Sequence, residues 1–89
     1  MDDLKRRIFR LVEEERIRED PHFRQRCAER DATLMDAVKV LKNGKLRLDK
    51  CEGDNLCFQG IDTKERSTFV VIKIDDSSDL MRIVTIWRD

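Results

Sequence analysis

Residues 68–74 read Thr-Phe-Val-Val-Ile-Lys-Ile and form the most β-prone stretch of the 89-residue chain. Such a nearly continuous apolar run is typical of a central strand, which is buried on both faces of its sheet. Polar turns flank this run, and shorter strand patterns lie beyond them. Because the turns are short, we expect successive hairpins and hence a four-stranded antiparallel sheet. Its strands are predicted at about residues 45–51, 56–61, 68–75 and 80–88.

The first half of the chain has the three-to-four residue apolar spacing of amphipathic helices. Asp20-Pro21 separates two of them, because proline is tolerated in a first helical turn and the residue before it leaves helical geometry. Thr33, with Asp36 three residues later, predicts the capped start of a third helix. Gly44 predicts its end, by taking the left-handed conformation. We therefore expect a single α+β domain over residues 1–89, with helices at about 2–19, 22–30 and 33–43 packed on one face of the sheet.

Charge and composition exclude several classes of protein. Basic and acidic residues both number 19, so the formal net charge is zero and no global basic field indicates nucleic-acid binding. A polyanion site must then arise from local clustering. No apolar run approaches the ~18–20 residues of a membrane helix, and the N-terminus lacks an apolar signal segment, so no membrane association is expected. The odd number of three cysteines fits a reducing cytoplasm.

The sequence lacks the common motifs for metals and cofactors. Three cysteines and one distant histidine do not have the spacing of a zinc site, so buried free thiols are expected and no metal. A P-loop, a dinucleotide-binding glycine pattern and a serine nucleophile elbow are also missing. We therefore expect no cofactor.

The second predicted helix carries three residues that share one side, because positions four apart are neighbours on a helix. They are His22, Arg26 and Arg30. Histidine titrates near neutral pH without special tuning, and the two arginines offer forked donors suited to phosphate. This stripe predicts an anion-facing surface with a group that can take or give a proton. The alternative is an ordinary surface histidine with arginines that pair internally with Glu29, Asp31 or an acidic residue of the sheet.

The last predicted strand ends in residue types that can hold a nucleotide. Thr85, Trp87 and Arg88 offer a hydroxyl, a stacking ring and a cation. The alternative is that Trp87 belongs to the core and Arg88 to a frayed end. Strict alternation along the strand places Arg82 and Arg88 on one face and Thr85 and Trp87 on the other.

These residues together resemble a known family. The pattern His22-x3-Arg26-x3-Arg30, a threonine at position 33, a helix that ends in Leu41-Lys42-Asn43-Gly44 and a closing Ile-Val-Thr-Ile at 83–86 carry the resemblance. They resemble small prokaryotic proteins of unknown function that open with H-x3-R-x3-R-G-[IV]-[ST] and close with I-V-T-V. Those proteins are related to the RelE, BrnT and MqsR toxins of toxin–antitoxin pairs. The chain departs from the pattern at Asp31-Ala32, where the family has glycine and isoleucine or valine, and it contains no tyrosine.

The resemblance implies a RelE-like fold and the toxin component of a type II toxin–antitoxin system. Such a protein is a cytoplasmic, metal-independent endoribonuclease that cleaves mRNA by attack of the 2′-hydroxyl. His22 would then act as base or acid, and Arg26 and Arg30 would stabilise the phosphorane charge. Further RNA-binding residues of the same groove would be Lys73, Arg82, Thr85, Trp87 and Arg88.

The partners implied by the resemblance are RNA and a cognate antitoxin, a small zinc-finger or helix-turn-helix protein. A homodimer is left open. The alternative function is a non-catalytic binding or regulatory module that keeps the toxin fold and binds a protein partner.

Overall fold

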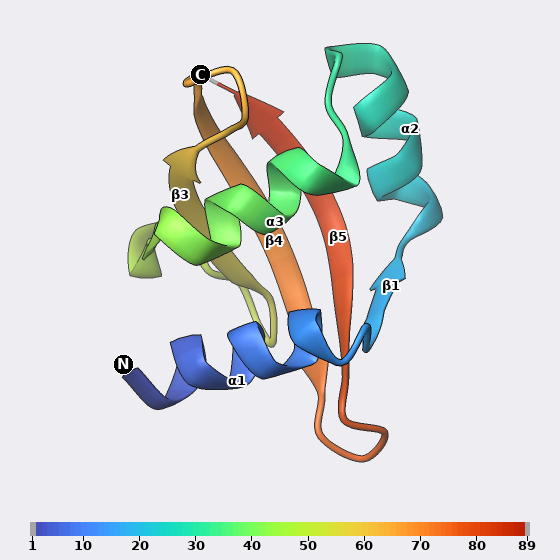
Figure 1. Ribbon diagram of the computed structural model, residues 1–89, viewed down its shortest axis with the longest axis vertical. Coiled ribbons are helices and arrows are strands. Elements are labelled where there is room, and N and C mark those ends of the chain that lie inside the picture. Colours follow the sequence, from blue (N-terminus) through green and yellow to red (C-terminus); the bar gives the residue numbers. More distant parts are fainter. Residues whose placement is uncertain (1, 89) are drawn as a thin grey trace.

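The computed structural model describes residues 2–88 and confirms the α+β class. Its helices are α1 (Asp2–Glu13), α2 (Pro21–Arg30) and α3 (Leu34–Asn43), with a short 3-10 helix η1 (Leu48–Lys50). Its strands are β1 (Ile17–Glu19), β2 (Lys45–Leu46), β3 (Leu56–Ile61), β4 (Ser67–Asp75) and β5 (Leu80–Arg88). The three α-helices lie on one side of the sheet, as predicted (Figure 1).

The sheet has five strands in the order β1-β5-β4-β3-β2, and it is mixed. The predicted hairpins β3-β4 and β4-β5 are antiparallel, as is the pair β2-β3. The prediction of four antiparallel strands was wrong at one edge, because β1 adds a fifth strand that runs parallel to β5. Residues 17–19, expected within the first helix, form this strand.

Helix α1 ends early because the chain turns at Glu15. This residue has a left-handed backbone with φ of 57°. The N–H of Arg16 donates to the carbonyl of Leu11 at 2.8 Å, and the N–H of Glu15 donates to that of Val12 at 3.1 Å. These two bonds are the Schellman pattern of a helix end, which glycine usually occupies. Here a glutamate occupies it, so the sequence has no glycine to indicate the stop.

The first strand of the predicted meander is much shorter than residues 45–51. Only Lys45–Leu46 pairs with β3, and residues 48–50 turn into η1 instead. Gly44 also acts differently from the prediction, since its φ of −83° and ψ of 172° are extended and not left-handed. A Cβ at Gly44 would lie 2.5 Å from the carbonyl oxygen of Val40 and 2.6 Å from that of Gln59. The glycine is therefore needed for the close approach of α3 to β3.

The core lies between the helices and one face of the sheet. Ile8 and Leu11 of α1, Phe23 of α2, and Val40 and Leu41 of α3 are fully buried there. The matching strand residues are Phe58, Val70, Ile72, Met81, Ile83 and Ile86. Thr33 and Asp36 form the predicted capping box of α3, and Asp20 caps α2 with Pro21 in its first turn.

A bulge in β5 reverses the expected alternation. Val71 pairs with Thr85 but its neighbour Ile72 pairs with Ile83, so Val84 is an extra residue. Ile83 and Ile86 both reach the core as a result. The predicted face assignment was therefore wrong, since Arg88 lies on the helix side and Arg82 lies opposite, with Thr85 and Trp87.

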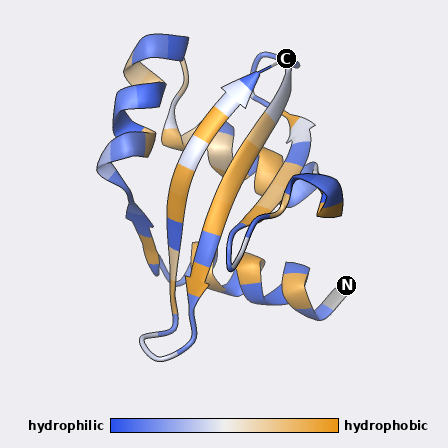
Figure 2. Cartoon of the chain, turned by 180° about the vertical axis from the view of Figure 1, so that it is seen from behind, coloured by the Kyte–Doolittle hydropathy of each residue, from blue (hydrophilic) through white to orange (hydrophobic). Residues whose placement is uncertain are grey.

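The second face of the sheet carries no α-helix of residues 2–88. Figure 2 views the molecule from this side, with β4 and β5 in front of the helices. We call it the open face and define it by Phe69, Val71 and Lys73 of β4 and by Arg82, Thr85 and Trp87 of β5, which alternate with the core residues along each strand.

Candidate functional site

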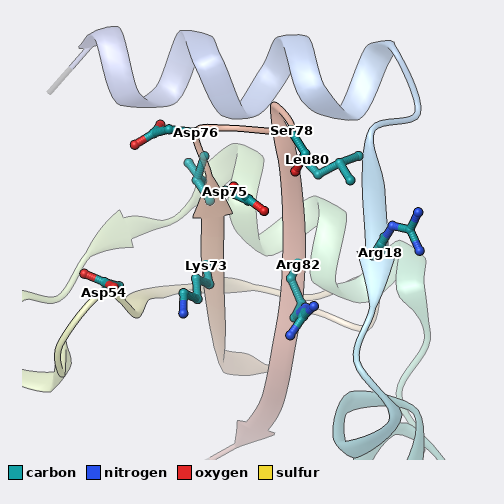
Figure 3. Close-up of a pocket in the computed structure, with 9 residues that line it drawn as sticks. Arg18, Asp54, Lys73, Asp75, Asp76, Ser78, Leu80 and Arg82 are labelled. Atoms are coloured by element: carbon teal, nitrogen blue, oxygen red, sulfur yellow. The ribbon is translucent and has the colours of Figure 1, made fainter.

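Three cations form a row across the open face. Arg82 of β5 is the direct partner of Arg18 on β1 and of Lys73 on β4. Figure 3 shows these three side chains at one level on adjacent strands. Like charges directly opposite each other destabilise a sheet, and they concentrate positive potential at one place. This basic row, Arg18-Arg82-Lys73, is therefore an anion-attracting surface.

The cations of the basic row have few acidic partners. The nearest approach is that of Arg82 Nη1 to Asp20 Oδ2 at 4.0 Å, and the Arg82 side chain is 59% exposed. Within residues 2–88, no carboxylate oxygen lies within 4.0 Å of the charged nitrogens of Arg18 or Lys73. The row can therefore take an external anion without first breaking a strong internal pair.

A hollow of about 550 Å³ lies beside the basic row at the β4-β5 turn. Its volume is within the range of small-molecule sites. Leu80 contributes apolar surface, and the three cations and three carboxylates contribute charge (Figure 3). The carboxylates are Asp54, Asp75 and Asp76. The hollow can thus contact both an anionic group and a group that donates hydrogen bonds.

The Asp75 carboxylate is held charged by hydroxyl and amide donors. The side chain and the backbone N–H of Ser77 donate to its Oδ1 at 2.7 and 3.0 Å. Hydrogen bonds from the side chains of Ser77 and Ser78 lower the pKa of Asp75 to about 2. Its neighbour Asp76 is instead paired with Arg7 of α1 at 2.6 Å.

Helix α2 adjoins the basic row through its N-cap. Asp20 Oδ1 accepts from the backbone N–H of His22 at 2.9 Å, while the other oxygen of the same carboxylate faces Arg82.

The predicted stripe of His22, Arg26 and Arg30 is present in part. His22 Nε2 accepts a long hydrogen bond of 3.5 Å from Arg26 Nε, and Arg26 also pairs with Glu29 at 3.0 Å. Arg26 therefore has the internal partner that the alternative interpretation expected.

Arg88 lies on the helix side of the sheet, where its side chain bonds to other parts of the protein. Its guanidinium donates to Asp62 Oδ2 at 3.2 Å and to the backbone carbonyls of Arg30 and Asp31 at the end of α2. Asp62 is fully buried and also accepts from Arg66 Nε at 2.9 Å. Burial alone would raise the pKa of Asp62, but the backbone N–H groups of Arg66 and Lys64 and the side chains of Arg88 and Arg66 hold it well below its usual value.

The other end of the open face is aromatic. Trp87 stacks on Phe69 with ring centroids 5.0 Å apart and planes 7° from parallel. Phe69 is buried, and Lys50 Nζ lies 5.4 Å from its ring centroid, whereas Trp87 is half-buried. Thr85 lies between this pair and the basic row, opposite Val71. The structure thus brings Lys73, Arg82, Thr85 and Trp87 together and separates Arg88 from them.

Two residues around the basic row were not predicted from the sequence as site residues. Arg18 was assigned to a helix, so its pairing with Arg82 was not expected. Asp75 was counted as the last residue of the predicted strand 68–75, where a polar turn begins, and no role was given to it. The only signal for it was the Asp-Asp-Ser-Ser composition of residues 75–78, which favours side-chain capping of a carboxylate.

No family model, no curated protein and no solved structure matches this chain. In residues 2–88, no helix is long and apolar enough to cross a membrane. Over the same range, no group of three or more histidine, cysteine or acidic side chains is arranged to hold a metal ion.

Proposed function

We propose that this protein binds single-stranded RNA on the open face of its sheet and cleaves it as a metal-independent, toxin-type endoribonuclease. The observation that carries the proposal is the basic row, in which Arg18, Arg82 and Lys73 lie in register on three adjacent strands. Single-stranded RNA is commonly held by cations that contact its phosphates and by aromatic rings on which its bases stack. The open face offers both, because Trp87 lies at its other end.

His22 is the proposed proton acceptor for cleavage. It lies at the start of α2, next to the Asp20 carboxylate that faces Arg82. In the proposed reaction the imidazole takes the proton of a 2′-hydroxyl, and the 2′-oxygen forms a bond to phosphorus. The P–O5′ bond breaks, and the leaving oxygen takes a proton from water. The products are a 2′,3′-cyclic phosphate and a 5′-hydroxyl. Arg82 and Arg26 offset the charge that develops on the phosphorane.

The toxin class rests on the sequence resemblance. On this proposal the fold is RelE-like, the protein acts in the cytoplasm, and a cognate antitoxin of the zinc-finger or helix-turn-helix kind holds it silent. Arg30 would contribute charge at the far end of the stripe, where its side chain is exposed.

Cleavage of a labelled single-stranded RNA in the presence of EDTA tests the proposal. We expect products with cyclic phosphate ends from the wild type and at least a hundredfold slower cleavage by His22→Ala, a typical contribution of a general base. Arg24→Ala is the matched control, because Arg24 is an exposed cation of the same helix whose nearest acidic partner is Glu19 at 3.9 Å. Unchanged cleavage by His22→Ala would contradict the assignment, and an inactive wild type would contradict the enzyme.

A partner-binding module without catalysis is the second candidate, and one observation favours it. Met35 on α3 is 66% exposed and borders an apolar hollow of about 390 Å³ with Val38 and the lysines Lys39 and Lys42. Exposed apolar surface of this kind is typical of an interface. Under this alternative, RNA stays intact while Met35→Lys abolishes binding of a protein partner encoded beside this one.

A further inference from the structure

We propose that Cys51 and Cys57 form a redox-sensitive pair, in which hydrogen peroxide converts the two thiols into a disulfide that fastens η1 to β3. The inference goes beyond the proposed function and does not depend on it, because neither cysteine belongs to the basic row or to α2. The observation that carries it is the contact between the Cys51 sulfur and the backbone of Cys57, at the end of the β2-β3 pairing.

The Cys51 thiol stands in for a backbone hydrogen bond between the two strands. The N–H of Arg47 donates to the carbonyl of Cys57 at 2.8 Å, which continues the antiparallel pairing of β2 and β3 by one residue. The reciprocal bond would run from the N–H of Cys57 to the carbonyl of Arg47. Instead, Cys51 Sγ accepts from that N–H at 3.4 Å and donates to that carbonyl at 3.3 Å. These two contacts hold the sulfur beside Cys57.

A tight turn brings the two cysteines within reach of each other. The N–H of Asn55 donates to the carbonyl of Glu52 at 2.9 Å, and Gly53 has a φ of 57°. Because Cys51 Sγ lies 3.4 Å from the backbone nitrogen of Cys57, covalent geometry keeps the two Cα atoms within about 8 Å. Disulfides usually join Cα atoms that are about 4.4–6.8 Å apart. A shift of about 1 Å in the exposed turn, with rotation of the side chains, is therefore enough for a disulfide.

The two sulfurs lie on the same side of the sheet and differ in exposure. Cys57 is fully buried and is opposite Val71, a residue of the open face, whereas Cys51 is half-buried at the end of η1. Burial and the neighbouring Cys51 raise the pKa of the Cys57 thiol, although the charges of Lys50 and Arg47 act in the opposite direction. Cys51 is thus the thiol that a peroxide reaches first, and Cys57 is the one that resolves the oxidised sulfur.

The oxidation balances with one molecule of hydrogen peroxide. The Cys51 thiolate attacks a peroxide oxygen, so that an S–O bond forms, the O–O bond breaks, and the leaving hydroxide takes the proton of the thiol to become water. The Cys57 sulfur then attacks the Cys51 sulfenic acid. The S–S bond forms, the S–O bond breaks, and the hydroxide leaves as water with the proton of Cys57. Transient disulfides of this kind serve redox sensing in reducing compartments.

Mass spectrometry of the wild-type chain, treated with hydrogen peroxide and then alkylated with iodoacetamide, tests the inference. Trypsin cleaves after lysine and arginine, so both cysteines fall in one peptide, residues 51–64, and Cys27 falls in another, residues 27–30. We expect the 51–64 peptide to lose the mass of two hydrogen atoms and to take up no iodoacetamide. Dithiothreitol should reverse both changes. The measurement uses the wild type and so does not depend on the folding of a variant.

Cys27 is the internal control. It packs against the core on the helix side of the sheet, so it should remain open to alkylation at the same peroxide concentration. Cys27→Ser should form the disulfide like the wild type, and in Cys51→Ser the remaining Cys57 should stay a thiol. Two alkylated cysteines in the 51–64 peptide after peroxide would overturn the inference. Oxygen added to Cys51 while Cys57 is still alkylated, or a crosslink to Cys27, would also overturn it, and each of these results would leave the proposed RNA cleavage untouched.

Discussion

Asp20 and Arg82 connect helix α2 to the sheet, with 4.0 Å between Oδ2 and Nη1, while Oδ1 caps the helix at His22. Loss of the cap in Asp20→Ala should cost about 1 kcal/mol of unfolding free energy. Asp20→Ser keeps a capping oxygen and should lose only a few tenths of that. Urea unfolding of the two variants checks this. Equal destabilisation by serine and alanine would show that the cap is not what Asp20 supplies.

The same two variants separate the effect of Asp20 on protein stability from its effect on the position of His22. Both lack the carboxylate that faces Arg82, so both should bind RNA slightly more tightly than the wild type at low salt. Cleavage by Asp20→Ala should be slower than by Asp20→Ser, because the uncapped first turn frays and displaces His22. Identical cleavage rates would mean that the position of His22 does not depend on this cap.

Asp62 should make stability depend on pH. Its pKa is lowered in the folded protein, so the folded state binds fewer protons than the unfolded state near and below the ordinary aspartate pKa of about 4. Its contribution is therefore fully present at neutral pH and is lost as the pH falls below about 4. Urea unfolding at pH 7 and pH 3 should show a smaller loss for Asp62→Asn than for the wild type. A parallel loss in both proteins would contradict this role.

Substitution of Arg88 should lower the stability of the fold and leave RNA affinity unchanged. Arg88→Ala leaves the buried Asp62 with one fewer cation and removes the donors to the end of α2, at a cost of about 1–3 kcal/mol. Because Arg88 faces away from the open face, RNA affinity measured well below the melting temperature should stay within twofold. A large loss of RNA affinity at unchanged stability would return Arg88 to the binding surface.

Glu15 should be replaceable by glycine with a gain in stability. Its φ of 57° is costly for a residue with a Cβ, by roughly 1 kcal/mol, and its side chain is exposed. Glu15→Gly should therefore raise the melting temperature by a few degrees. The backbone strain that glycine removes outweighs the stability lost because glycine increases the entropy of the unfolded chain. Glu15→Ala keeps the strain and is the control. A lower melting temperature for the glycine variant would show that the turn is not strained.

Much of the fold could be predicted because its signals are local. Proline after Asp20, the capping pair Thr33 and Asp36, and the alternating apolar strands after residue 55 each act within a few residues. Strand β1 could not be predicted, since three residues carry no clear period and their partner, β5, lies more than 60 positions away. The stop of α1 at Glu15 lacks the glycine that usually marks it.

The candidate site was predictable by residue type and not by position. Lys73, Arg82, Thr85 and Trp87 were expected to bind RNA, and they do lie on one face. Strict alternation would have put Arg82 with Arg88 instead, and only the bulge at Val84 reverses this. Bulges have no simple local pattern. Arg18 lies in the basic row because β1 pairs with β5. This pairing between distant parts of the chain has no signal in any one stretch of sequence.

The salt dependence of RNA affinity tests the central claim, that the basic row holds the phosphates. Each cation that neutralises a phosphate of single-stranded RNA contributes about 0.7 to the slope of log affinity against log salt, so three cations give a slope on the order of 2. Lys73→Ala and Arg82→Ala should each lower the slope by about 0.7, and Lys39→Ala, an exposed lysine of α3 on the other side of the sheet, should leave it unchanged. Equal slopes for all four proteins would contradict the claim.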